Sequence, residues 1–191
     1  MVNLEQNQGF TLIELLTTLA VAAVLASIAA PNLNASVQSM KVQSMGEDLL
    51  MALQRARSEA LRLGSRVTVC PSNDSATCDT AAGWANGWLT FNDINANGVV
   101  DTGEDILAVD KANNPLLFVT TSSGLKRSVS FLASGRTATN SGEPLSGVIR
   151  ICSSSEAISN EKRARDLVVT STGRTALTTS AHAVPPTCPA P

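Results

Sequence analysis

The chain has 191 residues, of which 43% are hydrophobic, and a formal net charge of −2, a size and composition that suit one modest domain with an apolar anchor. The composition excludes the common enzyme classes, because it offers one histidine (His182), no glycine-rich phosphate loop after a strand, and no paired carboxylates beside a base. We therefore predict a protein that is not an enzyme.

Charge is unevenly distributed along the chain. Seven acidic and no basic residues lie between Arg66 and Lys111, whereas nine basic and four acidic residues follow from Lys111 to the end. This asymmetry suggests an acidic face for an ion or a partner and a separate basic face, although scattered solvated charges explain it equally well.

Residues 10–30 form an apolar run of 21 residues, which as a helix spans about 31 Å, enough to cross a bilayer core. Glu14 lies within this run, where an ionised carboxylate costs about 2.5 to 3.5 kcal/mol. If the chain were cut after Gly9, the new amino group of Phe10, or that of a neighbouring subunit, would lie near enough to pair with Glu14. The alternative, a secretory signal peptide, normally has a basic N-terminal region, and residues 1–8 contain no Lys or Arg.

Gly9-Phe10-Thr11-Leu12-Ile13-Glu14-Leu15 resembles the processing site and N-terminal helix of type IV pilins and type II secretion pseudopilins, with Pro31 at the usual kink position. This resemblance implies a leader of residues 1–9, cleavage after Gly9 by a prepilin peptidase, and methylation of Phe10. It also implies a single-pass inner-membrane anchor at 10–30, with Glu14 and Pro31 serving filament assembly. The head is then expected in the periplasm.

Residues 31–63 continue the helical pattern with one apolar face, which includes Met45, Leu49 and Leu53, and Gly64 ends it. Because Pro31 lies inside this pattern, we expect it to kink the helix rather than divide it. The sequence thus predicts one helix from about Phe10 to Leu63, whose second half supports a soluble head.

The segments that follow narrow the resemblance. Residues 54–60 (QRARSEA), 67–70 (VTVC) and 87–93 (GWLTFND) are similar to the H-type minor pseudopilins and the FimT/FimU minor pilins. Residues 66–70 read as a strand, and further short β-branched runs are expected at 106–109, 116–120, 129–132, 148–152 and 167–170. The fold class is therefore α+β, a long N-terminal helix packed on an antiparallel β-sheet head at 64–182, followed by a Pro-rich tail at 183–191.

Residues 93–104 satisfy the calcium-loop pattern D-x-[DN]-x-[DN]-G-x5-E in full. The oxygen donors would be Asp93, Asn95, Asn97, Asp101 and Glu104. Because the preceding segment reads as a strand, the domain is not an EF-hand, and the alternative is a hairpin held by Asx turns. Calcium is the one cofactor that the sequence suggests.

Four cysteines lie beyond the apolar run, which in an exported domain indicates two disulfides. Three connectivities are possible. We favour Cys70 with Cys78 as a local loop, and Cys152 with Cys188 as a clip between the tail and a strand. A zinc site is the alternative, but the cysteine spacing and the single His182 match no usual zinc pattern. Trp84 and Trp88 are both expected in the core, although one of them could instead be exposed for contact with a partner.

We conclude that the chain resembles a minor pilin or pseudopilin of a type II secretion pseudopilus or a type IV pilus, assembling near the filament tip with other minor subunits and the major subunit. The alternative function is DNA capture, because FimT-like minor pilins are implicated in DNA binding through a Gly-Arg-x-Arg loop. Here Gly173-Arg174-Thr175-Ala176 lacks the second arginine. The candidate DNA contacts are Arg136, Arg163, Arg165 and Arg174, with Lys162 beside them. A third reading, a free secreted calcium-binding module, would require removal of the apolar helix.

Overall fold

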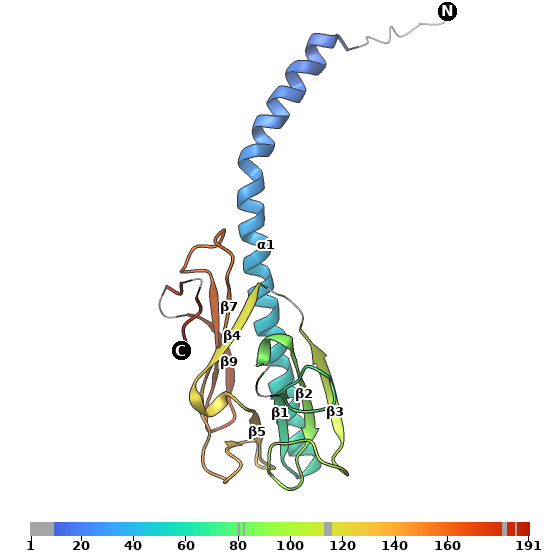
Figure 1. Cartoon of the computed structure of the whole chain (residues 1–191), viewed down its shortest axis with the longest axis vertical. Helices are drawn as coiled ribbons and strands as arrows, with labels where there is room; N and C mark the ends of the chain where they lie inside the picture. The colour runs from blue at the N-terminus through green and yellow to red at the C-terminus, as the bar shows by residue number, and fades with distance from the viewer. Residues whose placement is uncertain (1–9, 80, 82, 113–115, 181–182, 186) are drawn as a thin grey trace, which may run out of the picture.

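The structure is a computed structural model that describes residues 10–79, 81, 83–112, 116–180, 183–185 and 187–191, with the side chains of 28–32 left out. Its spine is the helix α1 (Leu12–Leu63), which is 52 residues long and runs without a break through Pro31. The lower part of α1 lies against the head, while its N-terminal part projects beyond it as a gently curved rod (Figure 1). The single long helix expected from the sequence is confirmed.

Local chemistry sets both ends of α1. Thr11 is the N-cap and forms a reciprocal capping box with Glu14. Gly64 follows the last turn in the left-handed conformation, with φ of 65°, and its N–H donates to the carbonyl oxygen of Ala60. Glycine adopts this conformation without a steric penalty, so the helix ends where the sequence predicts.

Two antiparallel sheets make up the head. The first has the order β3-β2-β1-β5-β6 and the second the order β4-β7-β8-β9. The strands of the first sheet are β1 (Val67–Pro71), β2 (Gly87–Asn92), β3 (Ile106–Lys111), β5 (Val129–Phe131) and β6 (Thr137–Ala138). Those of the second are β4 (Leu117–Thr121), β7 (Gly147–Ser153), β8 (Ala164–Val169) and β9 (Thr175–Thr179). Two short 3-10 helices, η1 (Trp84–Asn86) and η2 (Ser123–Leu125), connect strands.

The main core lies where α1 meets both sheets. Helix residues at spacings of three and four face it and are fully or almost fully buried: Val42, Met45, Leu49, Leu53, Ala56 and Ala60. Leu33, Val37 and Met40, which the sequence places on the same apolar face, remain exposed, whereas Gln38 at the same level of the helix is buried. The contact between helix and head therefore covers less of α1 than the amphipathic pattern suggests.

Both tryptophans are buried, which confirms the expectation that they lie in the core. The indole Nε1 of Trp84 donates to the carbonyl oxygen of Leu125 at 3.2 Å, which anchors η2 on the core. In the second sheet, Arg150 on β7 pairs across the strands with Asp166 on β8 at 2.8 Å, and this hydrogen bond raises the pKa of Arg150. The head thus combines an apolar core with a partly buried ion pair.

Candidate functional site

The N-terminus of α1 is the first candidate site. The backbone N–H and the hydroxyl of Thr11 both lie 3.2 Å from Oε2 of Glu14, and the Thr11 hydroxyl accepts the N–H of Glu14 at 3.3 Å. This capping box holds the carboxylate beside the first turn of the helix, where the helix dipole favours a negative charge. Gly9 lies outside the described residues, so the cleavage site itself is not placed.

Apolar side chains cover the projecting part of α1 on all sides and remain exposed. The large ones are Phe10, Leu12, Ile13, Leu15, Leu16, Leu19, Val21, Val24 and Leu25, each more than half exposed. An exposed apolar surface of this extent marks a contact with a membrane or with other proteins. Pro31, the second residue expected to serve assembly, lies within the helix, and its side chain is outside the description.

Within the part of the chain that the structure describes, no helix combines the length and the apolar character needed to cross a bilayer.

The cysteines form two disulfides, Cys70 with Cys78 and Cys152 with Cys188, which is the connectivity that we favoured. The first closes the loop that follows β1. The second ties the C-terminal tail to β7, where Cys152, Ala164, Val184 and Cys188 form a small separate core. Cys188 lies close to Thr120, whose hydroxyl also donates to the carbonyl oxygen of Pro189, so the tail is fastened at more than one point.

The loop that carries the calcium-binding pattern, residues 93–104, connects β2 to β3. Its residues hydrogen-bond one another: Glu104 accepts the N–H of Ile94 at 2.8 Å, and Asp101 accepts the side-chain amides of Asn95 and Asn97 at 2.8 and 2.7 Å. These amide hydrogen bonds lower the pKa of Asp101. As the loop stands, no group of three or more His, Cys, Asp or Glu side chains among the described residues is gathered closely enough to hold a metal ion.

The four arginines singled out for DNA are not equivalent. Arg163 is 2% exposed, and its guanidinium donates to the carbonyl oxygens of Ser153, Ser155 and Ile158. Arg165 is half-buried, and its Nε donates to the side chain of Gln43 on α1 at 2.7 Å. These two side chains therefore hold parts of the head together in the structure, a role that the sequence analysis did not predict.

Arg136 and Arg174 are exposed and lie on two turns that touch. A Cβ placed on Gly173 would clash with the carbonyl oxygen of Gly135, and a Cβ on either glycine would lie 3.2 Å from Nε of Arg57. Both glycines have positive φ, 73° at Gly135 and 81° at Gly173, so they permit the tight turns as well as the close approach. The fold thus brings together two Gly-Arg pairs that are 38 residues apart.

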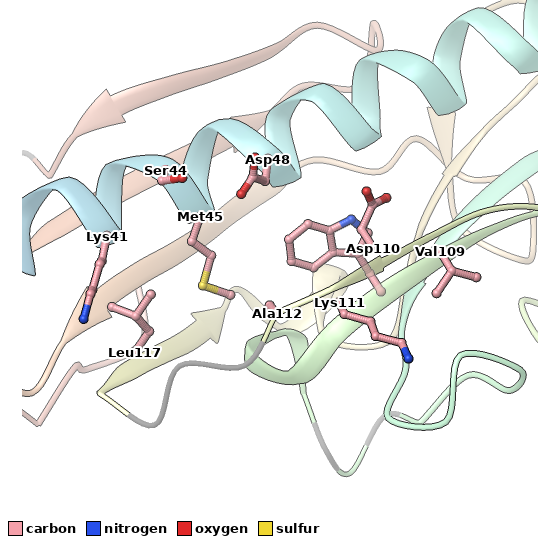
Figure 2. Close-up of a pocket in the computed structure, with 10 residues that line it drawn as sticks. Lys41, Ser44, Met45, Asp48, Val109, Asp110, Lys111, Ala112 and Leu117 are labelled. Atoms are coloured by element: carbon pink, nitrogen blue, oxygen red, sulfur yellow. The ribbon is translucent and has the colours of Figure 1, made fainter.

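A hollow of about 500 Å³ lies between α1 and the strand β3 (Figure 2). Met45, Val109 and Leu117 give it apolar walls, while Asp48 and Asp110 add carboxylates and Lys41 and Lys111 add ammonium groups. Asp110 is paired with Arg55 at 3.3 Å, and burial together with the nearby charge of Asp110 raises the pKa of Asp48. Sequence reasoning did not single out this hollow, because its residues come from segments far apart in the chain.

The long helix with an exposed apolar N-terminal part, joined to a head of two antiparallel sheets, defines a pilin-like filament subunit. Residues 46–173 match the family model of the type II transport protein GspH, and residues 6–30 match the prokaryotic N-terminal methylation motif. The chain belongs to the GspH family. Members of this family are structural subunits, so the prediction that the chain is not an enzyme is confirmed.

Solved structures with the same fold come from both kinds of system. The type IV minor pilin FimU of Pseudomonas aeruginosa is 23% identical, with a TM-score of 0.51, and the match covers 74% of this chain and 91% of that chain. A second crystal form of FimU is 22% identical, with a TM-score of 0.52 and coverage of 74% and 95%. The minor pseudopilin EpsH from the Type 2 Secretion System of Vibrio cholerae is 11% identical, with a TM-score of 0.50 and coverage of 74% and 99%. At these identities the likeness shows the fold, and a comparison with curated proteins gives no significant match.

Proposed function

We propose that this minor pilin or pseudopilin is cleaved after Gly9, methylated on Phe10, and inserted near the tip of a short filament. Before assembly, residues 10–30 anchor it in the inner membrane with the head in the periplasm. The observation that carries the proposal is the apolar N-terminal part of α1, which projects beyond the head with its large side chains exposed. Burial of such a surface against neighbouring helices or lipid is favourable by about 25 cal/mol for each Å² of apolar area removed from water.

Glu14 gives this apolar rod a specific contact. Its carboxylate already receives the N–H of Thr11, and the amino group produced by cleavage would belong to Phe10, the residue immediately before. A methylated amine at that point remains positively charged and can pair with Glu14 of the same chain or of the next subunit. The pairing compensates the cost of taking the carboxylate out of water.

Two measurements test the proposal. Mass spectrometry of the protein isolated from membranes should give a mature chain that begins with methylated Phe10. Deletion of the gene should then abolish either the release of secreted proteins or pilus-dependent motility, which assigns the filament to type II secretion or to a type IV pilus. A mature chain that retains residues 1–9, or a deletion without effect on either process, would overturn the proposal.

DNA capture is the second candidate function, supported by the contact between the turns that carry Arg136 and Arg174. Two exposed arginines on turns that touch at their glycines, with the guanidinium of Arg57 near those glycines, can bind phosphates of one strand. Arg163 and Arg165 do not belong to this surface, because carbonyl oxygens and Gln43 hold their guanidinium groups.

The DNA hypothesis can be tested by mobility shift of the full chain in detergent at two salt concentrations. The double variant R136A/R174A should bind DNA more weakly than the wild type. The slope of log K against log salt should become less steep by about two, because each lost phosphate contact reduces it by about one. K162A, which changes an exposed lysine outside the paired turns, is the control. Equal binding by the double variant and the wild type would exclude these arginines.

A further inference from the structure

The loop between β2 and β3 has the backbone that an oxygen-ligand ion site requires. Ala96 and Gly98, at the fourth and sixth positions of the pattern, both have positive φ, 62° and 74°. A non-glycine residue in this region is uncommon, and a sharp turn at the sixth position is what allows alternate residues of a calcium loop to face one ion. The Oδ1 atoms of Asn95 and Asn97 accept the N–H groups of Asn97 and Val99, which keeps both side chains folded over the loop. The N–H of Gly98 donates to Oδ2 of Asp93 at 3.2 Å, so the carboxylate at the first position faces the inside of that turn.

Asp93 is the observation that points to a ligand. The residue is 0% exposed, and its Oδ2 accepts hydrogen bonds from the hydroxyl of Thr68 at 2.7 Å and from Gly98. Its Oδ1 is also shielded from solvent and has no hydrogen-bond donor among the described residues. None of the ion pairs among those residues includes Asp93. Since a buried carboxylate is normally paired with a cation or bound to a metal, this side chain lacks its counter-charge.

The other acidic side chains of the loop are held by neutral N–H donors in place of a cation. Glu104 bridges the N–H groups of Ile94 and Asp101 at 2.8 and 3.1 Å, which keeps the twelfth position of the pattern close to the second and the ninth. Asp101 is fixed by the amides of Asn95 and Asn97. Three carboxylates on one short loop have no basic neighbour in it, so a divalent cation would relieve their mutual repulsion.

We propose that residues 93–104 bind one calcium ion. The ligands are Oδ1 of Asp93, the side-chain oxygens of Asn95 and Asn97, the carbonyl oxygen of Val99 and the carboxylate of Glu104, with Asp101 bound directly or through water. To close on the ion, Glu104 releases the N–H of Ile94, and the amide nitrogens of Asn95 and Asn97 release Asp101. Calcium fits better than magnesium, because a flexible loop that offers six or more oxygens of mixed type matches its larger coordination number.

The ion would act on the packing of the head as well as on the loop. The side-chain amide of Asn140 donates to the carbonyl oxygen of Asn97 at 2.5 Å, and the guanidinium of Arg66 donates to that of Thr139 at 3.0 Å. Thr68, which holds Asp93, lies on β1 in the centre of the first sheet and also hydrogen-bonds Ser130 on β5. Calcium therefore fixes the end of β2, the start of β3 and the turn after β6 together. This inference is independent of the proposed role in a filament.

Calorimetric titration of the calcium-free full chain in detergent with calcium chloride tests the site. We expect saturable binding of one ion, with a dissociation constant between about 10⁻⁵ and 10⁻³ M because two of the side-chain ligands are neutral, and an accompanying rise in melting temperature. Magnesium chloride at the same concentration should give much less of either effect.

Two loop variants and one control decide the assignment. D93N and E104Q should each weaken calcium binding at least tenfold, and E104Q provides the test if D93N lowers stability by itself. D105N changes the exposed acid that follows the loop and should bind like the wild type. Absence of binding in the wild-type chain, or equal affinity in the wild type and E104Q, would overturn the proposal.

Discussion

At the scale of single residues, Arg163 illustrates how burial decides the role of a charge. Its guanidinium donates to three carbonyl oxygens and to the side chain of Asn160, all of them in the segment that precedes β8. Replacement by alanine removes the guanidinium donor from the buried carbonyl oxygens of Ser153 and Ile158. We expect R163A to lower the free energy of unfolding by about 3 kcal/mol. Chemical unfolding of R163A beside K162A, which should stay within about 0.5 kcal/mol of the wild type, checks this, and equal stability of the two variants would contradict it.

Asp74 gives a prediction about pH. Hydrogen bonds from the hydroxyl and N–H of Thr77 and from the N–H of Ala76 hold the pKa of its carboxyl far below the usual range. Because the folded-state pKa is depressed, the stabilisation is present above the ordinary pKa of about 3.9 and is lost as the pH falls toward the folded value. An NMR titration of the side-chain carboxyl carbon should show no midpoint near pH 4 for Asp74. A midpoint at the ordinary value would show that these hydrogen bonds are absent in solution.

The sequence alone could not distinguish the buried arginines from the exposed ones. Arg163 and Arg165 stand in the same basic segment as Lys162, and nothing in their spacing distinguishes a buried guanidinium from an exposed one. The contact between Gly135 and Gly173 likewise depends on two hairpins from different sheets. By contrast, Gly64 could be assigned as the end of the helix from the sequence, because its role follows from local chemistry, whereas the capping contact of Glu14 with Thr11 was not predicted.

At the scale of the elements, the two disulfides close loops of different length. Cys70 and Cys78 are separated by 8 residues in sequence, and Cys152 and Cys188 by 36. On the loop-entropy model, loss of the shorter link costs about 2.6 kcal/mol and loss of the longer one about 3.8 kcal/mol. We expect C152A/C188A to be the less stable double variant by about 1 kcal/mol, measured by chemical unfolding against C70A/C78A. The reverse order would show that the packing of the local loop outweighs chain entropy.

The element pattern was predictable to different degrees. The long helix and the strands with β-branched, alternating residues, such as β1, β2 and β7, lie close to where the sequence placed them. The two strands β6 and β9 were missed, because Thr137–Ala138 is too short to show a period and Thr175–Thr179 carries one large apolar residue, Leu177. The division of the strands into two sheets also depends on long-range pairing, such as β1 with β5, which a local pattern does not encode.

At the scale of the whole molecule, the two parts of α1 have separate tasks. The C-terminal part of α1 packs into the head. At Gly46 a Cβ would come within 2.8 Å of Leu177 on β9, so the helix and the second sheet approach closely. The upper part leaves the head and exposes its apolar surface (Figure 1). One continuous helix therefore joins the exposed apolar surface to the head.

In the proposed assembly, the charge of Glu14 is the decisive feature. E14Q keeps an oxygen that can accept the N–H of Thr11 but removes the negative charge that would pair with the methylated amine. We expect E14Q to be cleaved and to reach the membrane, yet to fall at least tenfold in sheared filaments, measured by quantitative immunoblotting with the mature N-terminus verified by mass spectrometry. T11A, which weakens the cap by about 1 kcal/mol and keeps the charge, should be incorporated normally. Normal incorporation of E14Q would mean that the carboxylate serves only to cap the helix, since the amide retains that function.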